Sequence, residues 1–143
     1  MKGLPMLKTI LVANDGSKSA ERAFQFAVEL AKAFQAKVTV VSVAQPSEPP
    51  TSVETPALLE AATEHFEKDF VVFREAAKTA GVPLETAVVV GYPADQIVHQ
   101  AAEREADMIV MGHRGRSRIQ RWLLGSVSKR VLSYATCTVT IVR

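Results

Sequence analysis

Short apolar runs alternate along this chain with longer segments in which apolar residues recur every three or four positions. A short apolar run bounded by turn residues predicts a buried strand, whereas the longer spacing predicts one face of an amphipathic helix. The chain therefore alternates strands with helices. The predicted strands are Leu7–Ala13, Lys37–Ala44, Glu85–Val90, Asp107–Met111 and Thr138–Val142.

Four helices are predicted between these strands. The first opens at Ser17 or Ser19, either of which can cap it. The second is long, begins at Ala57 after a proline-rich loop over Gln45–Pro56, and ends at Gly81. The third starts near Pro93 and the fourth is short. Their apolar faces are Ala20, Ala23, Phe24, Ala27, Leu30, Ala31 and Phe34; Leu58, Ala62, Phe66, Phe73, Ala76 and Ala80; Ile97, Val98, Ala101 and Ala102; and Val127, Val131 and Leu132.

Strands that are almost continuously apolar and alternate with helices indicate a parallel sheet covered on both faces. Right-handed crossovers leave few topologies, and the most economical is a doubly wound α/β sheet of five strands in the order 3-2-1-4-5. The sequence shows no internal repeat and no linker, so residues 1–143 are predicted to form a single domain.

Composition narrows the class of protein. Apolar residues make up 48% and charged residues 22%, which is typical of a soluble globular protein. No apolar stretch is long enough for a membrane span, so we expect no membrane association and a cytoplasmic protein. Cys137 is the single cysteine, and the three histidines lack ligand spacing, so no metal site is assigned.

Charge is distributed unevenly. Residues 1–107 carry ten Lys or Arg against fifteen Asp or Glu, a net charge of −5, whereas the rest of the chain has seven bases and no acid. Such a basic segment suits an anionic partner: phosphate, nucleic acid or an acidic surface. A solvated loop whose arginines pair with acids elsewhere explains it equally well. Four arginines cluster after the fourth strand: Arg114, Arg116, Arg118 and Arg121.

A doubly wound sheet binds ligands beyond the carboxyl ends of its strands, where the winding reverses. The segment after the fourth strand contains Gly112, Gly115, Gly125 and Ser126. Glycines let the backbone adopt positive φ and approach a ligand, and the free N–H groups of a helix start attract anions. Hydroxyls of Ser126 and Ser128 could add hydrogen bonds. Taken singly, Gly112 reads equally as a strand end and Ser126 as a helix cap.

Several classes of enzyme are not indicated. The chain has no GxxxxGK[ST] phosphate loop, and the turn at Asn14–Ser17 is no Gly-x-Gly-x-x-Gly fingerprint. Neither a nucleophile elbow nor a pair of carboxylates poised for acid–base chemistry is present. No catalytic residue is assigned, and any ATP turnover is expected to be slow. The pattern is that of a binding protein.

The arrangement Gly112-x-x-Gly115-x9-Gly125-Ser126 resembles the nucleotide-binding signature of the universal stress protein family. The likeness extends over nearly the whole chain, since Ile10–Ser17, Val38–Ala44, Val89–Pro93 and Asp107–Gly112 are similar to the family's strands and turns. It implies the fold of adenine nucleotide alpha hydrolase-like proteins.

The resemblance also implies roles for single residues. Asp15 and Val43 would frame the base and ribose, although Asp15 alone reads equally as a turn residue. His113 replaces a small residue common in the family, where it would either crowd the site or bind a phosphate. Thr138 replaces a common proline before the last strand, which would loosen that edge. The remaining nucleotide-binding positions are Gly112, Arg114, Gly115, Gly125, Ser126, Val127 and Ser128.

The expected ligand is ATP, or AMP or ADP, with Mg²⁺ accompanying ATP. Family members commonly form homodimers through the last strand, here Thr138–Val142, and no nucleic acid is expected. Two alternatives remain: a slow adenine-nucleotide hydrolase or transferase, and a basic-faced adaptor that uses Arg114–Arg121 without a nucleotide.

Overall fold

The computed structural model describes residues 7–46, 54–114 and 124–143, with the backbone alone for residues 54 and 55. No helix within these ranges combines the length and the apolar character needed to cross a bilayer. In chain order the elements are β1 Thr9–Ala13, α1 Lys18–Phe34, β2 Lys37–Ala44, α2 Glu54–Ala80, β3 Leu84–Val90, α3 Pro93–Glu103, β4 Met108–Gly112, α4 Ser126–Tyr134 and β5 Thr138–Val142.

The strands form one parallel sheet in the order β3-β2-β1-β4-β5, which confirms the predicted doubly wound α/β topology. The chain winds outward from β1 to β3 and then returns to place β4 on the other side of β1. The winding therefore reverses between β1 and β4, where Val12 is in register with Val110. This is the place in a doubly wound sheet where a ligand is expected.

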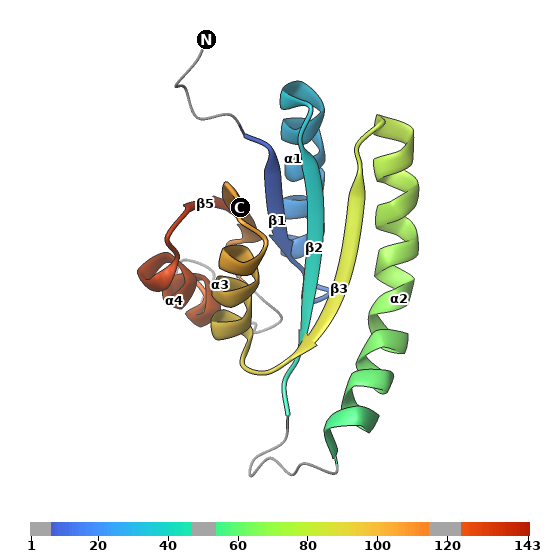
Figure 1. Cartoon of the computed structure of the whole chain (residues 1–143), viewed down its shortest axis with the longest axis vertical. Coiled ribbons are helices and arrows are strands. Elements are labelled where there is room, and N and C mark those ends of the chain that lie inside the picture. The colour runs from blue at the N-terminus through green and yellow to red at the C-terminus, as the bar shows by residue number, and fades with distance from the viewer. Residues whose placement is uncertain (1–6, 47–53, 115–123) are drawn as a thin grey trace.

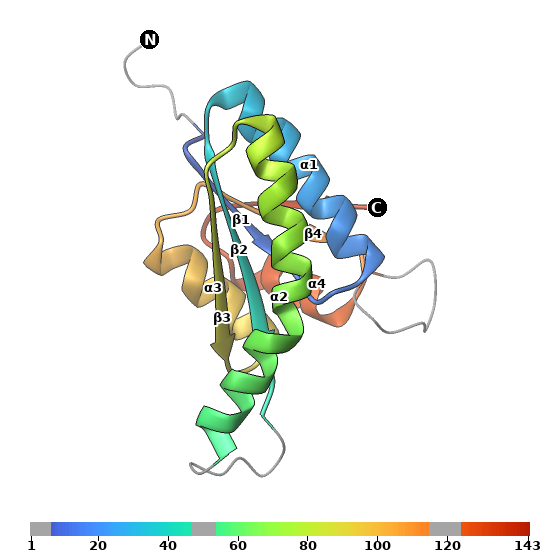
Figure 2. The same ribbon diagram turned by 90° about the vertical axis from the view of Figure 1, so that its right-hand side faces the viewer.

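Helices cover both faces of the sheet (Figures 1 and 2), α1 and α2 on one face and α3 and α4 on the other. On the first face Phe24 of α1 stacks on Phe73 of α2, with ring centroids 4.1 Å apart. On the second face Ile97 of α3 and Val131 of α4 pack over the sheet. Successive strand residues alternate between the faces, because side chains of a strand have a period of two.

Element boundaries and helix faces differ in places from the prediction. Helix α2 begins at Glu54 rather than Ala57, because Pro56 falls in its first turn, where a missing N–H costs little. The predicted loop over Gln45–Pro56 is correspondingly shorter. Four residues assigned to the apolar faces are exposed, namely Phe34, Ala76, Ala102 and Leu132, whereas Ala77 beside Ala76 and Ala101 beside Ala102 are buried.

Helix α1 lies unusually close to the end of β4. A Cβ atom on Gly112 would overlap Ser19 Oγ and would lie 2.7 Å from Ser19 Cβ and 2.8 Å from the Ser19 carbonyl carbon. The described glycines with positive φ are Gly16, Gly81 and Gly91, and Gly112 is not among them. The expectation of positive φ at Gly112 is therefore wrong. The absence of a side chain on Gly112 makes room for α1, because the backbone and the side chain of Ser19 both lie close to this position.

This packing predicts the effect of restoring a side chain. Gly112→Ala should lower the free energy of unfolding by about 1–3 kcal/mol, the cost of overfilling a close-packed contact. Urea denaturation of both proteins measures the difference. Adding Ser19→Gly removes two of the three atoms that the new Cβ meets and should recover part of the loss. A double variant no more stable than Gly112→Ala would contradict this explanation.

Candidate functional site

A cavity opens at the carboxyl ends of β1, β2 and β4, at the point where the winding reverses. The cavity has a volume of about 140 Å³. Its walls come from the turn after β1, the ends of β2 and β4, and the first turns of α1, α3 and α4. The lining residues are Ala13, Asn14, Asp15, Ser17, Ala20, Val41, Val43, Pro93, Ile97, Met111, Gly112, Arg114, Val127 and Ser128.

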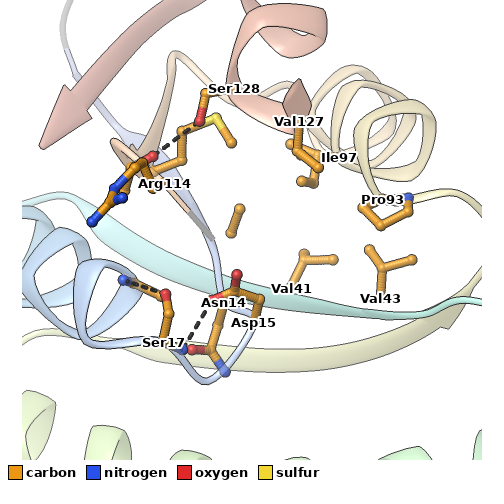
Figure 3. A pocket seen from close by; sticks show the side chains of 14 residues that line it. Asn14, Asp15, Ser17, Val41, Val43, Pro93, Ile97, Arg114, Val127 and Ser128 are labelled. Carbon is orange, nitrogen blue, oxygen red and sulfur yellow. Dashed lines mark hydrogen bonds between the residues drawn. The ribbon is translucent and has the colours of Figure 1, made fainter. Parts of the chain in front are cut away.

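The cavity has two chemically different ends (Figure 3). At one end Val41, Val43 and Pro93 lie together, with Ile97 and Val127 above them. At the other end the lining is polar, and Arg114 lies between Ser17 and Ser128. Aliphatic side chains can enclose a flat apolar group, while guanidinium and hydroxyl groups can bind an anion. The arrangement suits an elongated ligand with one apolar end and one negative end.

The turn between β1 and α1 supplies the cavity's carboxylate. Asp15 lines the cavity, and its Oδ1 also accepts a hydrogen bond from the Ser17 backbone N at 2.9 Å. Ser17 is the N-cap of α1, because its Oγ accepts from the Ala20 N at 3.1 Å. Gly16 has a φ of 82°, a conformation that side chains disfavour. The turn and cavity roles considered for Asp15 are therefore compatible within one structure.

Hydrogen bonds tie the start of α4 to the end of β4. The Gly125 backbone N donates to the His113 carbonyl at 3.0 Å, and Ser128 Oγ donates to the Gly112 carbonyl at 3.0 Å. The first turn of α4, whose N–H groups have no partner within the helix, thus stays beside the cavity. The hydroxyl hydrogen of Ser128 is already used, so this oxygen can act toward a ligand only as an acceptor.

Arg114 is the one positively charged residue among the described residues that line the cavity. Its Nη1 atom is buried and has no hydrogen-bond partner among the residues that the structure describes. A buried donor without an acceptor costs free energy, more so when it is charged. The guanidinium of Arg114 places hydrogen-bond donors and a positive charge at the cavity, which fits an anionic group such as a phosphate.

The structure brings together six of the residues selected from the sequence, and the remaining ones lie elsewhere. Asp15, Val43, Gly112, Arg114, Val127 and Ser128 line the cavity. Ser126 lines a neighbouring hollow with Tyr92, Asp95 and Arg130, and Gly125 and His113 are not part of the cavity wall. Gly115, Arg116, Arg118 and Arg121 lie outside the described residues.

Sequence reasoning missed several walls of the cavity. Val41 shares a strand face with Val43, so the strand period alone could have identified it. Ile97 and Met111 were recognised only as apolar residues of a helix and a strand. Nothing in the sequence distinguishes an apolar residue that lines a ligand site from one that fills a core. Their role depends on which segments meet at the sheet edge.

Comparison with known proteins identifies what the chain is similar to. Residues 6–143 match the model of the universal stress protein family. A relative from Thermus aquaticus, a universal stress protein encoded in a sulfhydrylase 3′ region, is 40% identical over 139 residues, covering 96% of this chain and 100% of that protein. Sequence similarity thus extends over essentially the full described sheet.

Solved structures share the architecture. Universal stress protein UspA from Lactobacillus plantarum superposes with a TM-score of 0.87 at 30% identity, covering 98% of this chain and 100% of that chain. A universal stress protein in complex with cAMP has a TM-score of 0.75 at 31% identity, covering 95% of this chain and 97% of that chain. One from Archaeoglobus fulgidus in complex with dAMP has a TM-score of 0.64 at 26% identity, with 97% and 100% covered.

His113 lies beside the cavity in a cationic environment. Its side chain is buried, and its backbone N donates to the Val142 carbonyl at 2.8 Å, which joins the end of β4 to β5. Burial lowers the pKa of the His113 imidazole below its ordinary value, and the positive charges of Arg143 and Arg114 lower it further. The imidazole is therefore neutral in the folded protein over a wider pH range than in the unfolded chain.

This shift predicts a loss of stability in mild acid. The unfolded chain binds a proton at His113 with an ordinary pKa of about 6.5, whereas the folded protein binds it at lower pH. The free energy of unfolding should therefore fall as pH drops from about 6.5 through the lowered pKa. His113→Gln should show a shallower decrease in urea titrations between pH 7 and 5. The same substitution at exposed His99 is the control, and equal slopes for wild type and His113→Gln would refute the assignment.

Proposed function

This chain belongs to the universal stress protein family, and we propose that it binds an adenine nucleotide, ATP or AMP, in the cavity between β1 and β4. Relatives with the same architecture that are solved in complex with cAMP and dAMP support the choice of adenine. The observation that carries the proposal is the division of the cavity into an apolar end and a polar end that is lined by Arg114.

The two ends assign the parts of the nucleotide. The flat adenine ring fits among the aliphatic side chains of Val41, Val43 and Ile97, where burial of apolar surface stabilises it. Asp15 would accept a hydrogen bond from the ribose 2′-hydroxyl. The phosphates would then extend toward Arg114 and the first turn of α4, whose free N–H groups favour negative charge.

The remaining signature residues belong to the phosphate side of this proposal. Gly115, Gly125, Ser126, Val127 and Ser128 would hold ribose and phosphates through backbone groups and the Ser126 hydroxyl, with Mg²⁺ accompanying ATP. Gly112 takes part through its carbonyl, which already positions Ser128. Asp15 is the sole carboxylate among the lining residues that the structure describes. We therefore propose a stress-response binding protein whose nucleotide state is read by a partner, rather than a hydrolase.

Calorimetric titration with ATP, AMP, cAMP and adenosine tests the proposal. Wild-type protein should bind ATP and adenosine, with ATP bound more tightly. Arg114→Gln should weaken ATP binding roughly 10- to 100-fold, because a hydrogen bond to a charged group contributes about 1.5–3 kcal/mol, and should leave adenosine binding unchanged.

Arg74→Gln is the matched control, since Arg74 lies on α2 and pairs with Glu67 away from the cavity. It should bind both ligands as wild type does. Absence of binding to every one of the four ligands would refute the proposed function. Equal weakening of ATP and adenosine by Arg114→Gln would refute the assignment of the phosphates to the polar end.

We also propose that two copies pair through β5. Strand β5 lies at one edge of the sheet, where one side of its backbone has no strand beside it among the described residues. Sedimentation velocity should show a dimer, and Thr138→Lys should weaken it at least about tenfold, because lysine on an edge strand opposes pairing. Thr79→Lys at the end of α2 adds the same charge elsewhere and should leave the dimer intact. A monomeric wild type would exclude this arrangement.

A further inference from the structure

Asn14, the residue that follows β1, connects three elements through one buried side chain. It is 4% exposed. Its Oδ1 accepts from the Gly16 backbone N at 3.2 Å, and its Nδ2 donates to Ser42 Oγ at 3.1 Å and to Asp69 Oδ2 at 3.3 Å. Both donors of the amide group and its oxygen are therefore engaged, and the plane of the amide is held by β2 and α2 together.

The acceptor on α2 is itself held in place. Asp69 precedes Phe70 and lies one turn before Phe73, both of which are buried against α1 and the sheet. The stacking of Phe73 on Phe24 fixes this part of α2 relative to α1. Asp69 lines a second cavity and is not part of the wall of the nucleotide cavity. Asn14 and Ser17 line both cavities.

We propose that Asp69 is a positioning residue of the nucleotide site: it acts through the Asn14 amide to hold the turn that presents Asp15 to the ribose. The inference rests on the proposed function, and it adds to the site a residue of α2 that does not touch the ligand. When Asp69 and Ser42 hold the two amide hydrogens, Oδ1 points at the Gly16 N. This fixes the backbone on either side of Asp15.

Loss of the contact between Asp69 and Asn14 should weaken the binding of only one part of the ligand, the ribose. Two hydrogen bonds hold the turn around Asp15. The Gly16 N donates to Asn14 Oδ1, and the Ser17 N donates to Asp15 Oδ1. If the Asn14 amide turns away, the Asp15 carboxylate loses its fixed position, while the aliphatic end and Arg114 are unaffected. Binding that uses the ribose 2′-hydroxyl should therefore weaken more than binding that does not.

The experiment compares AMP with 2′-deoxy-AMP in titrations of three variants. Asp69→Leu occupies similar space without an acceptor, and Asp69→Asn removes the charge but keeps an oxygen. Asp69→Leu should weaken AMP binding about three- to tenfold, in line with the loss of a hydrogen bond, and should change 2′-deoxy-AMP binding less than twofold. Asp69→Asn should bind both ligands nearly as wild type, which separates the hydrogen bond from the charge.

Glu67→Gln provides the control for removing a negative charge from α2, because Glu67 is exposed and pairs with Arg74. It should leave both affinities unchanged. Unchanged AMP binding by Asp69→Leu, or equal losses for AMP and 2′-deoxy-AMP, would overturn the inference while the proposed function stands. Absence of nucleotide binding by the wild type would refute the proposed function instead.

A measurement on ligand-free protein tests the positioning step alone. Hydrogen exchange at the Gly16 and Ser17 amides reports the two bonds that enclose Asp15. Asp69→Leu should accelerate exchange at both amides, whereas Asp69→Asn and Glu67→Gln should not. Unaltered exchange in Asp69→Leu, with the core amides of β1 still protected, would show that Asp69 does not hold this turn, whatever the nucleotide result.

Discussion

The close approach of α1 to the end of β4 is the contact on which the site depends. Because Gly112 has no side chain, Ser19 and the backbone of the first turn of α1 can lie directly against the strand end. The turn at Asn14–Ser17, which leads into α1, is thereby brought opposite Arg114. A helix displaced outward by one methyl group would move one wall of the cavity away from the other.

Three segments that are distant in sequence form the polar side of the cavity, and each is held by backbone hydrogen bonds of its own. The turn after β1 is held through Asn14, and the start of α4 is tied to the end of β4 through Gly125 and Ser128. Preorganisation of this kind lowers the conformational cost of binding. Arg114 is the exception, since its buried Nη1 has no hydrogen-bond partner in the described parts of the chain.

Positive charge is concentrated in the C-terminal part of the chain. Residues 108–143 have seven bases and no acid. Burial lowers the pKa of His113, and two of these cations, Arg143 and Arg114, lower it further. A phosphate bound beside Arg114 would offset part of this positive charge.

The order of strands and helices followed from the sequence alone, because apolar periodicity reports local burial and the right-handed crossover rule limits the topology. Asp15, Val43, Val127 and Ser128 were also reachable from the sequence, since parallel strands end at one edge and the spacing of glycines resembles a known family. Tertiary structure decided the rest. It showed that Gly112 accommodates Ser19 and that Asn14 reaches Asp69, 55 positions away. Such contacts depend on how the helices dock on the sheet, and no local sequence pattern reports which distant residues will meet.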